Sequence, residues 1–128
     1  MAHAIASIGT TNYAVSIRAR HHQLSSDEGA SLGGKDAGPA PYDLLCSALG
    51  ACTAITLRMY AERKQWPLRA VEVDCRFKRE GESSSIDRIL ALDGELSDEQ
   101  RARLADIAER TPMTLTLKQG LAITTAVK

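Results

Sequence analysis

Residues 44–57 read LLCSALGACTAITL, a run of fourteen residues that carries no charge and holds two of the chain's three cysteines. Proline is tolerated at the first position of a helix, and the residue before a proline avoids helical geometry. Pro41 before this run and Trp66-Pro67 after it therefore predict a helix from about Pro41 to Gln65. The helix is apolar on every side until Arg58, which predicts that its first half is surrounded by protein.

The length of the chain limits how that helix is covered. The 128 residues are enough for a single domain, 1–128, whose one small sheet covers only one side of a helix. We therefore expect a second copy of the chain, in a homodimer, to cover the rest. The numbers of basic and acidic residues are equal, 16 of each, which argues against nucleic acid or an anionic membrane as partner.

The sequence also limits where the protein works and what it binds. The uncharged run is shorter than the roughly 18 to 20 apolar residues that cross a bilayer, so we expect no membrane span. The beginning of the chain, MAHAIASIGTTNYAV, resembles no secretory leader, which predicts a cytoplasmic protein. The three cysteines have no C-x-x-C spacing, which argues against a disulfide framework and a zinc site. We expect neither a metal nor a cofactor.

Alternating apolar residues predict a strand before the helix. From residue 12 to residue 20, apolar side chains alternate with polar or small ones, which places Arg18 and Arg20 together on the face opposite the apolar one. Residues 21–33 are typical of a turn or short hairpin, and residues 33–41 of a loop rich in glycine and proline.

The chain after the helix predicts a β-hairpin. Residues 71–78 alternate apolar and charged side chains, which is the clearest strand pattern of the sequence. Residues 81–85 predict a turn, and residues 86–92 predict a partner strand that ends near Gly94.

A second helix and a last strand are expected near the end of the chain. Ser97 and Gln100 have the spacing of a capping box and precede an apolar stripe with helical periodicity. Residues 111–120 are compatible with either a strand or a short helix, and apolar residues in 121–127 predict a final strand. The order of these elements indicates an α+β fold.

The segment GPAPYDLLCSALGACTAITLRMYAERK, residues 38–64, resembles the OsmC/Ohr family of organic hydroperoxide reductases. The similarity continues through the following strand, the second helix and the Thr111-Pro112 turn, and it spans the chain from Tyr13 to its end. It is closest to the OsmC-like branch of the family. The resemblance implies an intertwined α+β homodimer in which long central helices are wrapped by antiparallel sheets of both chains, with active sites at the interface.

The resemblance also implies which residues act. Family members use a peroxidatic cysteine on the central helix, assisted by an arginine and a glutamate, and a resolving cysteine that precedes a proline. Cys52 stands at the peroxidatic position, and the arginine corresponds to Arg18 or Arg20.

This chain departs from the family pattern at two positions. The residue after the helix-entry proline is Tyr42 instead of glutamate, and Asp43 follows it. Asp43 either orients the arginine in place of the missing glutamate or only interacts favourably with the helix N-terminus. Thr111 stands where the resolving cysteine would be, so the internal disulfide of the family cannot form with that partner.

Peroxide reduction requires a thiolate, and a buried thiolate requires a positive neighbour. Arg58 is a poor neighbour because it points about 120° away from Cys52 on the helix. Apolar residues share the helix side of Cys52 and predict a pocket suited to an organic hydroperoxide. This predicted pocket comprises Tyr42, Leu45, Leu49, Ile55 and Met59.

A structural explanation is open for each of these features. Cys52 could be a small buried hydrophobe, as most cysteines in apolar helices are. Gly50 and Ala51 either admit a substrate or allow close packing of helices. Cys46 faces away from Cys52, and Cys75 either fills the core or serves as a resolving partner.

The leading hypothesis is a thiol-dependent peroxidase with a one-cysteine mechanism. Cys52 attacks an organic hydroperoxide, and an external thiol reduces the resulting sulfenic acid. The alternative is a non-catalytic homodimer that binds a small apolar ligand or has a structural role in a stress response.

Overall fold

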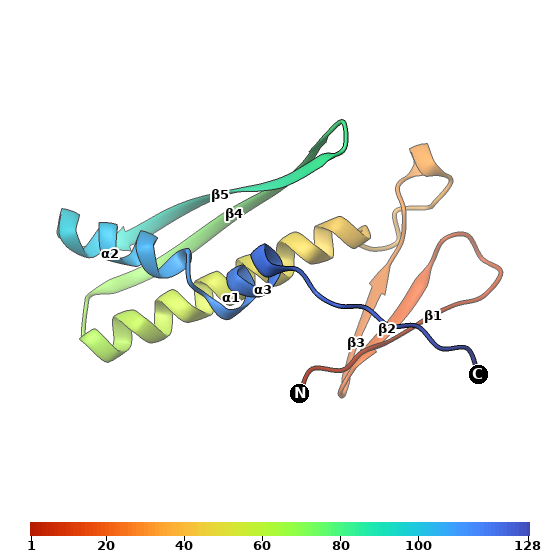
Figure 1. The fold of residues 1–128 in the computed structure, drawn as a ribbon, viewed down its shortest axis with the longest axis horizontal. Coiled ribbons are helices and arrows are strands. Elements are labelled where there is room, and N and C mark those ends of the chain that lie inside the picture. The colour runs from red at the N-terminus through yellow and green to blue at the C-terminus, as the bar shows by residue number, and fades with distance from the viewer. The chain divides into compact units, whose positions relative to one another are not determined.

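Five strands and three α-helices make up the chain, and the computed structural model describes all residues 1–128 (Figure 1). Their contacts divide the chain into two units, Met1–Leu45 and Cys46–Lys128. The elements in chain order are β1 (Ile5–Ile8), β2 (Val15–Ala19), β3 (His22–Ser26), a 3-10 turn η1 (Ala30–Leu32), α1 (Pro41–Lys64), β4 (Leu68–Glu80), β5 (Ser83–Gly94), α2 (Asp98–Ala108) and α3 (Pro112–Gln119). They form the α+β fold that the sequence predicts, whereas the expectation of a single domain remains a prediction.

The first unit holds a three-stranded antiparallel sheet in the order β1-β2-β3. The predicted strand at residues 12–20 is shorter than expected, because β2 begins at Val15 and ends at Ala19. Arg20 has a φ of +56° in the turn to β3, so it does not continue the alternation that would place it beside Arg18. β1 was not predicted, since four residues are too few to show an alternating pattern.

The carboxylate of Asp27 organises the loop that leads to α1. Asp27 is only 3% exposed, and its two oxygens accept hydrogen bonds from four backbone N–H groups. The donors are Tyr13 at 3.1 Å, Glu28 at 2.8 Å, Lys35 at 3.2 Å and Ala37 at 3.2 Å. Burial by itself raises the pKa of Asp27, but the four donors outweigh it and hold the pKa below its usual value.

Asp27 is expected to make the stability of the protein depend on pH. Because its pKa is lower in the folded chain, the carboxylate stabilises the fold above its unfolded pKa, and this contribution is lost as the pH falls towards the folded pKa. The wild-type protein should therefore have a higher free energy of unfolding than Asp27→Asn at pH 7, and this difference should shrink below about pH 4. Urea unfolding of both proteins from pH 7 to pH 3 measures the difference. A difference that does not change with pH would contradict this role of Asp27.

The helix α1 begins at Pro41, as predicted, and ends at Lys64, one residue before the predicted end. Its buried residues recur every four positions along one stripe: Leu49, Thr53, Leu57 and Ala61. Ile55 and Met59, on the other side, are 54% and 60% exposed. Ala48 and Ala51, in the first half of α1, are exposed as well, so within this chain that half is not surrounded by protein.

The length and composition of α1 are sufficient to span a membrane, since the helix extends beyond the uncharged run. The same helix contributes Leu57 and Ala61 to the core together with Leu68, Leu104 and Ala108, and core helices of soluble proteins often share this composition. Partly buried side chains from β4, β5 and α2 pack around these five residues. One such helix is therefore weak evidence for a membrane span.

β4 and β5 form the predicted hairpin, and both strands are longer than the sequence pattern indicated. Their antiparallel register pairs Leu68 with Gly94 at one end and Glu80 with Ser83 at the turn. Figure 1 shows this long two-stranded ribbon, with α2 following β5. Gly94 is required at the open end, because its φ is +148° and a Cβ there would lie 2.2 Å from the carbonyl oxygen of Pro67.

Replacing Gly94 by alanine is expected to lower the free energy of unfolding by about 2 kcal/mol or more. The new methyl group would overlap the Pro67 backbone, which cannot move without breaking the end of the ribbon. Gly81→Ala is the matched control, since Gly81 also has a positive φ, +61°, but faces open space, and it should cost only about 1 kcal/mol. Equal losses in urea unfolding would contradict the role of the Pro67 contact.

After the hairpin the chain forms two helices, α2 and α3, and no further strand. The predicted capping box of α2 is present, because Ser97 and Gln100 exchange side-chain and backbone hydrogen bonds. Residues 112–119 form a helix, since Pro112 occupies its first turn and the Thr111 side chain caps it. The predicted strand at 121–127 is wrong: the segment has no strand partner in this chain and is exposed. Alternation alone does not form a strand without a neighbouring backbone.

Candidate functional site

Cys52 lies on α1, between its buried stripe and its exposed side, and its thiol is free and half-buried. It makes no hydrogen bond or ion pair within residues 46–128. Of the predicted pocket residues in this unit, Ile55 and Met59 lie on the exposed side, whereas Leu49 belongs to the buried stripe. The apolar surface beside Cys52 is therefore an open face of the helix, with Leu49 turned into the core.

The remaining predicted site residues belong to the unit Met1–Leu45. Arg18 lies in β2, opposite Ile5 of β1 and Gln23 of β3, and its side chain is exposed. Arg20 is exposed in the turn that follows. Neither guanidinium makes an ion pair in the chain. Their assignment to the thiol of Cys52 stays a prediction.

The residues at the start of α1 have structural roles of their own. The Asp43 carboxylate accepts a hydrogen bond from the backbone N–H of Ala40 at 3.0 Å, which caps the first turn of the helix. This contact favours the helix-capping explanation for Asp43. Tyr42 is exposed and Leu45 is half-buried.

Arg88 is a buried cation that the sequence analysis missed. Its side chain on β5 is 13% exposed, and its Nη1 donates to the hydroxyls of Thr53 at 3.0 Å and Thr114 at 2.9 Å. Its Nη2 donates to the carbonyl of Ala108 at 2.8 Å and approaches Glu109 at 3.5 Å. One guanidinium thus connects α1, α2 and α3 to the hairpin.

A signal for Arg88 was present in the sequence. Ile86, Leu90 and Leu92 mark the inward face of β5, and Arg88 occupies the same alternating position. A charged residue at an inward position requires partners, and those partners come from three helices distant in sequence. Sequence alternation could show that Arg88 points inward, but it could not show what it contacts.

Thr111, at the position where the family resemblance implies a resolving cysteine, is held in place by hydrogen bonds. Thr111 is fully buried, and its hydroxyl lies 2.7 Å from that of Thr114. Thr114 also donates to the carbonyl of Ala108 at 3.1 Å. The turn before α3 is therefore held by hydroxyl groups and by Arg88, in place of a thiol.

Cys46 and Cys75 are free and half-buried like Cys52. Cys75 lies on β4 directly opposite Arg88 on β5. Burial raises the pKa of the Cys75 thiol, the Arg88 guanidinium partly offsets this rise, and Cys46 adds to it. The Cys75 sulfur would lie 3.9 Å from a Cβ on Gly50, so Cys75 faces the side of α1 that carries Gly50, and its role as a resolving partner of Cys52 stays a prediction.

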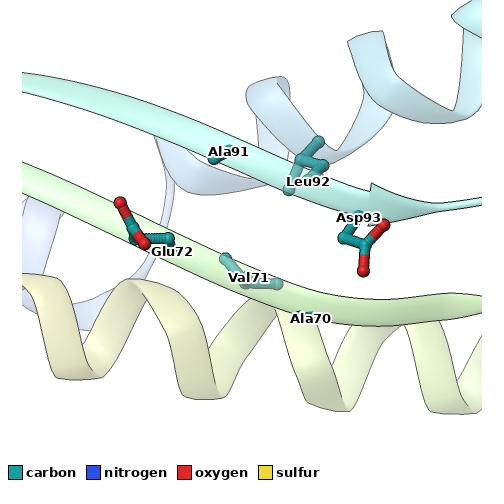
Figure 2. A pocket seen from close by; sticks show the side chains of 6 residues that line it. All are labelled: Ala70, Val71, Glu72, Ala91, Leu92 and Asp93. Carbon is teal, nitrogen blue, oxygen red and sulfur yellow. The ribbon is translucent and has the colours of Figure 1, made fainter.

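A shallow depression of about 440 Å³ lies on the β-ribbon and is separate from the cysteines. Figure 2 shows its lining side chains, which come only from β4 and β5: Ala70, Val71, Glu72, Ala91, Leu92 and Asp93. The Asp93 carboxylate is already paired with Arg69 at 2.8 Å. This depression offers no nucleophile and no free cation, so it is a poor candidate for peroxide chemistry.

Most of the chain matches a known protein family. Residues 33–126 match the family model described as OsmC-like protein. No curated protein matches the chain. Solved structures with the same fold include an OsmC-like protein from Mycoplasma pneumoniae, with a TM-score of 0.80 at 16% identity over 92% of this chain and 87% of that one.

Two further similar structures carry descriptions that mention peroxides. An organic hydroperoxide resistance protein OsmC from Legionella pneumophila has a TM-score of 0.66 at 18% identity, covering 90% of this chain and 87% of that one. An organic hydroperoxide resistance protein from Elizabethkingia anophelis has a TM-score of 0.64 at 17% identity, covering 85% and 81%. At these identities the structures share the fold, and the family match over residues 33–126 shows that the chain belongs to the OsmC-like protein family.

Proposed function

We propose that this protein reduces organic hydroperoxides with Cys52 as its only reacting cysteine and an external thiol as reductant. The observation that carries the proposal is the position of Cys52, a free thiol beside the exposed apolar side of α1 inside the segment that matches the OsmC-like family. The descriptions of the Legionella and Elizabethkingia proteins, which name organic hydroperoxide resistance, support the same substrate class.

The proposed reaction consumes one hydroperoxide and two external thiols. The Cys52 thiolate attacks the terminal peroxide oxygen, the O–O bond breaks, and the alkoxide takes up a proton to leave as an alcohol. The sulfenic acid on Cys52 then condenses with one external thiol and releases water. A second external thiol attacks the mixed disulfide, which frees Cys52 and yields a small disulfide.

A positive charge is needed beside Cys52 to favour the thiolate. Arg88 does not meet this need, because its Nη1 is bonded to Thr53, which faces the buried side of α1. Arg18 or Arg20 therefore remains the proposed source of the charge. We favour Arg18, because β2 pairs with strands on both sides and fixes its backbone, whereas Arg20 lies in a turn.

Replacing Arg18 by glutamine is expected to slow the reaction of Cys52 with cumene hydroperoxide about 100-fold, because a preorganised charge is removed from the reacting thiolate. Arg20→Gln is the matched control, with the same change two residues away, and it should slow the reaction much less. Stopped-flow measurement of sulfenic acid formation compares the two. An unchanged rate in Arg18→Gln would remove this residue from the mechanism.

We also propose that the protein works as a cytoplasmic homodimer. The exposed side of α1, with Ile55 and Met59, supports a partner that covers it, because large apolar side chains are rarely left exposed together on one helix face. Three free cysteines fit a reducing compartment. Sedimentation equilibrium measures the molecular mass in solution, and a mass of 13.8 kDa at every protein concentration would exclude the dimer. Cell fractionation tests whether the protein is cytoplasmic.

Trapping of the sulfenic acid tests the proposed function directly. One equivalent of cumene hydroperoxide should add one oxygen to the intact mass of the wild-type protein, and a dimedone probe should label the peptide that contains Cys52. Cys52→Ser should show neither change. Unmodified Cys52 under these conditions would favour the alternative, a non-catalytic OsmC-like dimer whose apolar face binds a small ligand or has only a structural role.

A further inference from the structure

Two of the three cysteines lie near Gly50, on the side of α1 that faces away from Cys52. Cys46 and Gly50 are one helical turn apart and share a face of α1. A Cβ on Gly50 would lie 3.8 Å from the carbonyl oxygen of Val73 and 3.9 Å from the sulfur of Cys75. β4 therefore crosses α1 at Gly50, with the thiol of Cys75 directed at the helix.

Gly50 allows β4 to approach α1 closely. A glycine inside a helix costs about 1 kcal/mol relative to alanine, and here the absence of a side chain lets the strand approach the helix backbone. A disulfide requires Cα atoms within roughly 7 Å, and the close approach of β4 to α1 at Gly50 favours such a separation.

Cys52 does not belong to this cluster. At 100° per residue the side chain of Cys52 points about 160° away from the direction in which a Cβ on Gly50 would point. Cys75 is paired instead with Arg88 across the ribbon; burial raises the pKa of the Cys75 thiol, and the positive charge of Arg88 offsets part of this rise. Both cysteines are half-buried, so a small reagent has access to them.

We propose that Cys46 and Cys75 form a second thiol site, which closes to an intramolecular disulfide by exchange with small disulfides. One of the two thiolates attacks the small disulfide, whose S–S bond breaks, so that a mixed disulfide forms and a small thiolate leaves. The second cysteine attacks the mixed disulfide and releases the other small thiolate. The two cysteines are oxidised, the small disulfide is reduced to two thiols, and the protons of the cysteines pass to these thiols.

The experiment uses the Cys52→Ser protein, in which Cys46 and Cys75 are the only thiols. Incubation with a series of oxidised and reduced glutathione ratios should lower the intact mass by about 2 Da, the loss of two hydrogens, and remove both free thiols. Trypsin should then release the peptides 36–58 and 70–76 joined by one disulfide. The oxidised protein should also melt at a higher temperature than the reduced one, since the bond closes a long loop.

A matched variant separates closure from simple reactivity. Cys46→Ser in the same background cannot close, so it should accumulate one glutathione on Cys75. In the Cys52→Ser protein itself, accumulation of a glutathione adduct without closure, a covalent dimer, or unchanged thiols would each overturn the proposal. The experiment contains no hydroperoxide, so its outcome is independent of whether Cys52 is a peroxidase.

Discussion

Cys52→Ser is expected to lower hydroperoxide turnover on the order of 10³-fold or more, with dithiothreitol as the external thiol. The serine hydroxyl has nearly the same size as the thiol, but it stays protonated at neutral pH and cannot store the oxidising equivalent as a sulfenic acid. Because the side chain is half-buried and makes no hydrogen bond, the substitution should leave the fold intact. Consumption of cumene hydroperoxide at fixed protein and thiol concentrations measures the loss.

The double variant Cys46→Ser/Cys75→Ser is the control for a one-cysteine mechanism. It keeps Cys52 as the only thiol of the chain, so turnover should stay close to that of wild type. A loss of turnover in the double variant as large as that in Cys52→Ser would show that the reaction needs a second cysteine of this chain. Residual turnover in Cys52→Ser close to wild type would reject Cys52 as the reacting residue.

Leu57→Ala is expected to lower the free energy of unfolding by about 3–5 kcal/mol. Leu57 is fully buried on the stripe of α1 that packs against Leu68 of β4 and against Leu104 and Ala108 of α2, so its removal affects contacts with two other elements at once. Three methyl-sized groups lose their contacts, and the helices around them cannot collapse fully into the space. Urea unfolding followed by circular dichroism gives the value.

Leu115→Ala on α3 is the matched control for this core substitution. Leu115 is 50% exposed, so the same chemical change should cost less than about 1 kcal/mol. Both variants are compared with wild type at one protein concentration, because dimer formation makes apparent stability depend on concentration. Similar losses in the two variants would show that Leu57 is not at the centre of the core.

Local sequence signals predicted the elements whose structure depends on their own residues. Pro41 and the proline at 67 set the ends of α1 within one residue, because proline restricts the backbone wherever the chain goes. Ser97 caps α2 as predicted. This signal is also local, because the hydrogen bonds of the capping box join residues only three positions apart in the chain. The hairpin also followed from local alternation, although its strands are longer than the pattern indicated.

The same signals failed where an element depends on distant residues. The segment 121–127 has the alternation of a strand and yet no partner in this chain. β1 is only four residues long and is recognised by its pairing with β2. The position of Asp43 in the sequence is compatible with a carboxylate that orients an arginine and also with a helix cap. The hydrogen bond from the backbone N–H of Ala40 supports the helix cap.

The sequence by itself determined the α+β class, the ends of the long apolar helix and the presence of Cys52 within it, because proline geometry, helical periodicity and residue identity act over a few residues. Only the tertiary structure decided that Arg88 is the buried cation joining three helices to the hairpin, and that Cys75 meets the Cys46 side of α1 across Gly50. Those contacts join residues that are far apart in the chain, and their geometry is fixed by the packing of β4 and β5 against α1, which no local pattern contains.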